Sequence, residues 1–131
     1  MGKASRDKGK RGERELANVL KEYGFDTHRG VQYQGGHDSP DVVGLPGIHI
    51  ECKRVEKLNL DAAMKQANED CGKQEAPAVF HRKNGGQWHV TMELRDWMYI
   101  FLCAQGGCSE GADFDRKENI FAFGRKDIIN V

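Results

Sequence analysis

The chain carries no excess charge and has no long apolar run. Its 20 Lys and Arg residues balance 20 Asp and Glu residues, so net charge gives no indication of a nucleic-acid partner. No apolar stretch reaches transmembrane length and no signal peptide is recognisable, so we expect no membrane partner and a reducing cytoplasm (the host cytoplasm if the chain is viral). No repeat or low-complexity linker divides the 131 residues, which suffice for a single core.

The four cysteines also lack a metal-binding pattern. Cys52, Cys71, Cys103 and Cys108 are irregularly spaced, without a C-x-x-C pair and without a histidine at ligand spacing. Structural zinc sites usually show such pairs in the sequence. From the cysteine spacing we therefore expect no zinc site.

Positive charge is concentrated at the start of the chain. Within the first fourteen residues only Asp7 and Glu13 oppose a run of basic side chains. We expect a basic arm over residues 1–12 that contacts phosphates, although a solubilising tail would explain the charge equally well. The basic residues of this region are Lys3, Arg6, Lys8, Lys10, Arg11 and Arg14.

Hydrophobic periodicity predicts the element order α-β-β-β-α-β-β-α. Helical spacing of apolar residues is present over 13–23, 60–71 and 94–104. Strand patterns cover 25–29, 41–44, 48–53, 76–82 and 87–92, and the last two flank an Asn-Gly turn. This order predicts an α/β fold, a mixed β-sheet flanked by helices.

The most informative segment is the expected hairpin from Asp41 to Lys53. If residues 45–47 form a three-residue loop, Asp41 lies opposite Glu51, and cross-strand partners share a face. Lys53 projects from that same face, because it is two residues beyond Glu51. Cys52 belongs to the opposite, apolar face, which suits a core.

Two converging carboxylates and an ammonium group are suited to hold a hard divalent cation and a polarised water. A salt-bridged hairpin on an exposed edge is the alternative, and the bare spacing fits it about as well. The apolar alternation favours an interior strand, where an acidic pair with no function would be costly.

The helix that opens Gly12-Glu13-Arg14-Glu15-Leu16, followed by a Gly-containing loop, Pro40-Asp41 and Glu51-Cys52-Lys53, resembles the archaeal-type Holliday junction resolvases of the PD-(D/E)xK nuclease superfamily. The resemblance covers roughly the first 95 residues. The loop departs from the family's usual glycine-serine form, and the tail after Ala104 has no counterpart. A restriction-endonuclease-like fold is what the resemblance implies.

The resemblance also implies a catalytic set. Glu13, Asp41, Glu51 and Lys53 match the family's catalytic positions. Asp41 and Glu51 would hold Mg²⁺, with Mn²⁺ as a substitute, the Cys52 backbone carbonyl as a further ligand, and Glu13 binding directly or through water. Helical periodicity alone does not choose between Glu13 and its neighbour Glu15, because neither lies cleanly on the core-facing stripe.

Several further polar residues have a functional and a structural interpretation. Gln66 lies where related nucleases place a supporting glutamine, but a solvent-facing helical Gln fits as well. His49 is interpreted as structural, although it shares the face of Glu51, and so are His81 and His89. The residues expected to contact DNA are Lys8, Lys10, Arg11, Arg14, Arg29 and His37.

We therefore expect a small metal-dependent DNA endonuclease that resolves four-way or other branched junctions in recombination and repair. Symmetric cutting of a junction implies a homodimer, and the apolar helix around Trp97 is the candidate interface. The alternatives are a viral-type nuclease acting on flaps or nicks and a non-catalytic DNA-binding module. The expected organisation is a basic arm over 1–12, a nuclease core over 13–105 and a C-terminal extension over 106–131 of unknown role in the same domain.

Overall fold

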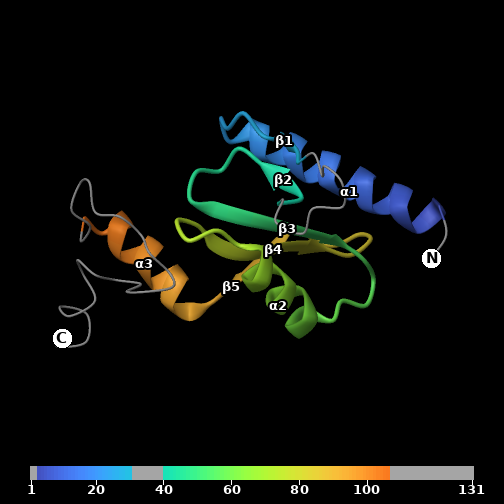
Figure 1. Cartoon of the computed structure of the whole chain (residues 1–131). Helices are drawn as coiled ribbons and strands as arrows, with labels where there is room; N and C mark the ends of the chain where they lie inside the picture. Colours follow the sequence, from blue (N-terminus) through green and yellow to red (C-terminus); the bar gives the residue numbers. More distant parts are fainter. Residues whose placement is uncertain (1–2, 31–39, 107–131) are drawn as a thin grey trace.

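The computed structural model describes residues 3–30 and 40–106. Its elements follow the expected order α-β-β-β-α-β-β-α, and Figure 1 shows their arrangement. The helices are α1 (Lys3–Glu22), α2 (Leu60–Asp70) and α3 (Leu94–Ala104). The strands are β1 (His28–Arg29), β2 (Val42–Val43), β3 (Ile48–Arg54), β4 (Ala76–Arg82) and β5 (His89–Met92).

The five strands form one mixed sheet in the order β1-β2-β3-β4-β5. Only β3 and β4 are parallel, and α2 is the crossover that connects them. All other neighbouring strands are antiparallel. This mixed sheet with flanking helices confirms the predicted α/β, restriction-endonuclease-like fold.

Helices α1 and α2 cover opposite faces of the sheet (Figure 1). Leu16 and Ala17 of α1 pack against Ile50 and Cys52 of β3, whereas Ala63 and Ala67 of α2 pack against Val79 of β4. Because side chains alternate along a strand, the residues of β3 between the α1-facing ones point toward α2. These residues are His49, Glu51 and Lys53.

The first helix is longer than the sequence predicted. It begins at Lys3 rather than Glu13, so the segment expected to be a basic arm over 1–12 is helical from Lys3 onward. Lys and Arg are good helix formers, and no proline interrupts the segment. The basic residues are thus carried on the same rigid element as the candidate catalytic acid.

Helix α3 covers neither face of the sheet. It lies at one end of the sheet (Figure 1). There Ile100 lines a pocket together with Gly47 and Ile48, from the turn between β2 and β3 and the start of β3. The rings of Trp97 and Phe101 stack with centroids 5.2 Å apart and remain 48% and 42% exposed. Of the expected extension over 106–131, only Gly106 lies among the described residues.

Helix α1 approaches the sheet closely at Gly12. A Cβ built there would lie 2.6 Å from Cβ of Arg54 on β3, closer than packed atoms allow. Gly9, one turn earlier, has open space around it. The missing side chain at residue 12 therefore sets how near α1, and with it Glu13, comes to β3.

Gly9→Ala and Gly12→Ala form a matched pair because both replace a glycine inside the same helix. Gly9→Ala should raise the free energy of unfolding by about 0.5–1 kcal/mol through helix propensity alone. Gly12→Ala gains the same propensity but forces α1 away from β3, so it should lower stability by about 1–3 kcal/mol. Urea denaturation measures both; equal effects would show that the close approach is unimportant.

Candidate active site

Asp41 is positioned by the pairing of β2 with β3. Val42 pairs with Ile50, the predicted register, and the Asp41 amide donates to the Ile50 carbonyl at 2.9 Å. Its carboxylate then reaches across the strand gap, where Oδ2 accepts a 2.8 Å hydrogen bond from the Cys52 amide. The carboxylate is therefore fixed to the backbone beside Glu51.

Glu51 is a buried acid next to another acid. Its side chain is 3% exposed, and burial together with the negative charge of Asp41 raises the pKa of Glu51 to about 8, against the opposing effect of Lys53. Lys53 Nζ lies 3.7 Å from Glu51 Oε1. Repulsion between the two carboxylates exceeds the relief that one half-buried ammonium provides.

Lys53 is held from the other side by α2. Its Nζ donates to Oε1 of Gln66 at 3.4 Å. Gln66 is itself exposed on α2, so both interpretations of this residue stay open. The Lys53 ammonium thus lies between Glu51 of β3 and Gln66 of α2, next to the acidic pair.

Glu13 joins the acidic group from α1. Burial is the largest influence raising the pKa of Glu13 and Asp41 adds to it, while the hydrogen bond from Arg29 opposes both. Arg29 Nε lies 2.7 Å from Glu13 Oε2. The pKa of the intervening Cys52 thiol is also raised, first by burial and then by the fields of Asp41, Glu13 and Glu51. Three carboxylates therefore surround this point of β3.

Glu15, the alternative helical acid, is directed elsewhere. It forms an ion pair with Arg82 of β4 and lies 3.7 Å from Arg54 Nε. Two positions apart on a helix, the two glutamates cannot share a direction. The geometry therefore favours Glu13 over Glu15 as the acid beside Asp41.

The donor atoms of this group fit a hard divalent cation. Asp41, Glu51 and Glu13 offer carboxylate oxygens, which are the ligands that Mg²⁺ prefers. Burial and the charge of Asp41 raise the pKa values of Glu13 and Glu51, so negative charge on these two carboxyls is not fully compensated by the protein side chains. A bound cation would supply that compensation.

A polar groove of about 430 Å³ lies between α1 and the end of β3, on the side of α1 that carries Glu15. Lys8 and Arg11 of the predicted DNA-binding set line it, together with Arg54 and Asn84, which the sequence analysis missed. Arg54 donates through Nη1 to Oδ1 of Asn84 at 2.8 Å. Strand alternation could have indicated Arg54, because it follows Lys53 and must face α1.

The remaining members of the predicted DNA-binding set are dispersed. Lys10 and Arg14 are exposed on α1, whereas Arg29 is half-buried in its ion pair with Glu13. Arg29 thus orients the acid in this structure. His37 lies outside the described residues.

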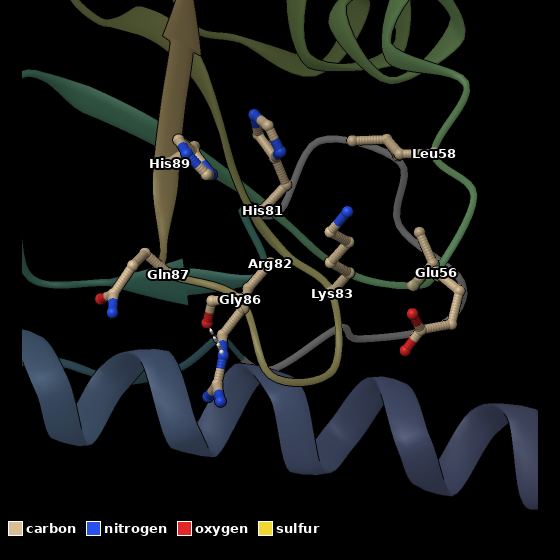
Figure 2. A pocket seen from close by; sticks show the side chains of 9 residues that line it. Glu56, Leu58, His81, Arg82, Lys83, Gly86, Gln87 and His89 are labelled. Atoms are coloured by element: carbon tan, nitrogen blue, oxygen red, sulfur yellow. Dashed lines mark hydrogen bonds between the residues drawn. The ribbon is translucent and has the colours of Figure 1, made fainter.

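A second pocket, of about 210 Å³, opens between the end of β4 and the segment that follows β3, with Glu56, Leu58 and Lys83 in its lining (Figure 2). His81, the neighbour of Lys53 across β3 and β4, and His89 line it with their rings stacked 5.6 Å apart. Burial and the proximity of His89 lower the pKa of His81, which also bonds to Thr91 Oγ1 at 2.9 Å. These contacts support the structural interpretation of both histidines.

Arg82 borders the same pocket but points away from it. Figure 2 shows its guanidinium directed toward α1, with Nε bonded to the Gly86 carbonyl at 2.7 Å. Its partner on α1 is Glu15. Arg82 thus helps keep Glu15 out of the acidic group.

Neutralising Glu51 should stabilise the metal-free protein at high pH. The folded state holds the Glu51 proton up to about pH 8, whereas the unfolded chain releases it near 4.5. The stability that the Glu51 proton contributes is therefore fully present below pH 4.5 and is lost as the pH rises through about 8. In chelator, Glu51→Gln should remove this decline and exceed the wild type by on the order of 2 kcal/mol above pH 8.

Urea denaturation at several pH values measures this effect. Glu69→Gln, an exposed glutamate on α2, is the matched control and should keep the wild-type profile. A parallel decline in wild type and Glu51→Gln would show that Glu51 is not the group responsible.

Among the described residues, no helix is both long and apolar enough to cross a bilayer. Comparison with curated proteins and with solved structures gave no significant match. The family model described as archaeal Holliday junction resolvase matches residues 4–102, which include the acidic group, Lys53 and the polar groove. This match spans most of the chain, and the chain therefore belongs to the archaeal Holliday junction resolvase family.

Proposed function

We propose that this protein is a metal-dependent endonuclease that hydrolyses phosphodiester bonds in branched DNA, with four-way junctions as its substrate. The observation that carries the proposal is the convergence of Glu13, Asp41 and Glu51 beside Lys53. Family membership supports the junction as the substrate. The protein would work in DNA recombination and repair in the cytoplasm.

Each residue of the group has a role in this proposal. Asp41 and Glu51 hold Mg²⁺, or Mn²⁺ in its place, and the Cys52 carbonyl and Glu13 complete the ligand set. When bound, the cation neutralises the scissile phosphate and lowers the pKa of a water molecule. Lys53 orients the attacking water or stabilises the charge on phosphorus oxygens in the transition state, and Gln66 holds its ammonium in position.

DNA binds in the polar groove between α1 and the end of β3. Lys8, Arg11 and Arg54 bring three cations to this groove, and among the described residues that line it Glu15 is the one acid. A phosphate contacted by each of them would release counterions, so affinity should fall steeply with salt. The groove and the acidic group share α1, which carries Lys8 and Arg11 as well as Glu13.

Two alternative functions are less well supported. A flap- or nick-directed nuclease would use the same acidic group, but the matching family model describes a junction resolvase. A non-catalytic DNA-binding module would have no need of carboxyls such as Glu13 and Glu51, whose pKa values are raised by burial and by the neighbouring Asp41. Each alternative predicts a different cleavage pattern.

We also propose that two copies associate through α3. A four-way junction has two strands to cut, so symmetric resolution needs two active sites. Leu94, Trp97, Ile100 and Phe101 are each at least 42% exposed on this helix. A second copy of the same face would bury these apolar surfaces.

Asp41→Asn should abolish cleavage of a four-way junction in Mg²⁺ while leaving DNA binding nearly unchanged. Loss of several kcal/mol of charge stabilisation corresponds to about a 10³-fold fall in turnover. Glu13→Gln should also depress turnover strongly. Cleavage is measured on labelled four-way, flap, nicked and linear duplexes, and binding is measured in chelator.

Glu15→Gln is the matched control for Glu13→Gln, since both neutralise a glutamate on the same helix. Its turnover at saturating DNA should change far less. Undiminished cleavage by Asp41→Asn would contradict the site, and preferred cutting of flaps or nicks would contradict the junction as substrate.

Trp97→Glu should convert a dimer into a monomer, because it places a charge in the proposed apolar interface. Light scattering after size exclusion measures the mass. The variant should still nick DNA but should lose the paired cuts that resolve a junction. Lys65→Glu, an exposed change on α2, is the control and should leave the dimer intact. A monomeric wild type would rule out this interface.

A further inference from the structure

A second group of potential metal ligands lies at the other end of β3. Within residues 3–30 and 40–106, His49, Cys71 and Glu75 each place one ligand atom within 4.8 Å of the other two. His49 comes from β3, Cys71 caps the end of α2, and Glu75 directly precedes β4. The crossover between β3 and β4 therefore brings together residues that are far apart in the sequence.

The cysteine spacing gave no indication of this group, because its ligands do not follow a pair motif. His49 and Cys71 are separated by a strand end and a whole helix. Only the parallel pairing of β3 with β4, in which His49 lies beside Pro77, places them together. The expectation of no zinc considered only the spacing of residues along the sequence, which does not report contacts between β3 and the turn before β4.

The distances within the group are close to those between the ligands of a tetrahedral site. Nδ1 of His49 lies 3.9 Å from Oε1 of Glu75. Zinc bonds of about 2.0–2.3 Å separate tetrahedral ligands by about 3.3–3.6 Å. A movement of a few tenths of an ångström would bring these two atoms to that separation.

Burial differs among the three ligands in a way that suits a metal with one open position. The His49 side chain is fully buried and Cys71 is nearly so, whereas the Glu75 side chain is 37% exposed. The Cys71 thiol donates to the carbonyls of Glu75 at 3.1 Å and Gly72 at 3.4 Å, which fixes the sulfur within the turn. The solvent side, where Glu75 lies, leaves room for a water as the fourth ligand.

The donor set discriminates between metals. A thiolate, an imidazole and a carboxylate suit Zn²⁺, whereas Mg²⁺ prefers oxygen ligands alone. The acidic group around Asp41 and Glu51 offers only oxygens from its side chains. The same strand thus presents two chemically different ligand sets on its α2 face.

We propose that His49, Cys71 and Glu75 form a zinc site that is separate from the nuclease site. Binding replaces the thiol proton of Cys71, which leaves to solvent, and the ion joins β3 to the turn between α2 and β4. The site stabilises the segment that carries Glu51, two residues after His49 on the same face. This inference does not depend on the cleavage activity.

The test uses the full chain, reduced with a non-thiol reductant and freed of metal by chelation. Co²⁺ is titrated in the presence of excess Mg²⁺, which occupies oxygen-only sites. The wild type should take up about one equivalent of Co²⁺. The visible bands of tetrahedral cobalt and the near-ultraviolet band of a thiolate–cobalt bond should appear together, and Zn²⁺ should displace them.

Two pairs of variants locate the binding. Cys71→Ala should lose the thiolate band and bind Zn²⁺ at least about 100-fold more weakly, while Cys52→Ala, the other buried free cysteine, should keep the band. Glu75→Gln should weaken binding by about 10–100-fold, and Glu69→Gln on the surface of α2 should not. The unfolding midpoint of the wild type should rise by roughly 10 °C in saturating Zn²⁺.

The opposite results would overturn the site. No cobalt uptake by the wild type, or a thiolate band that survives Cys71→Ala, would mean that the three residues form a hydrogen-bonded cluster only. Near-ultraviolet circular dichroism checks that each variant is folded. If Cys71→Ala does not fold, Glu75→Gln decides, because that side chain is partly exposed and its loss leaves the core intact.

Discussion

The hydrogen bond from the Cys52 amide to the Asp41 carboxylate is the contact on which the site depends. It fixes one acid against the strand that carries the next, although negative charges on the two carboxyls would repel each other. Burial and mutual repulsion then raise the pKa of Glu51. The fold must supply the energy to hold this group together, and it does so through the packing of Ile50 and Cys52 beneath it. Sites that place like charges together in this way are prepared for a ligand of opposite charge.

Much of the fold and of the acidic group could be predicted because each rests on a local pattern. Alternating residues in β3 indicated which side chains face the core, and the short loop after Gly44 set the register that places Val42 opposite Ile50. The resemblance to a nuclease family then selected Glu13, whose contacts with Arg29 and Asp41 support it over Glu15. Periodicity alone had left that choice open, because it reports the core-facing stripe and not the direction of a flanking acid.

The features that were missed arise from contacts between distant elements. The groove lined by Arg54 and Asn84 depends on how closely α1 approaches β3. Gly12 permits this approach, but a single glycine in a helix forms no sequence pattern that predicts it. The grouping of His49 with Cys71 and Glu75 depends on the parallel register of β3 and β4. The early start of α1 was missed for a different reason: its basic first half has no apolar stripe, so only intrinsic propensity supports the helix there.

The length of α1 has a mechanical consequence. Lys8 and Arg11 lie on the same unbroken helix as Glu13, and five residues of α-helix span about 7.5 Å along the axis. A continuous helix has little freedom to change the separation between the backbone positions of its residues. The helix therefore fixes the spacing between the backbone positions that carry Lys8 and Arg11 and the one that carries Glu13, so the phosphate-binding residues and the catalytic acid can move only as one body.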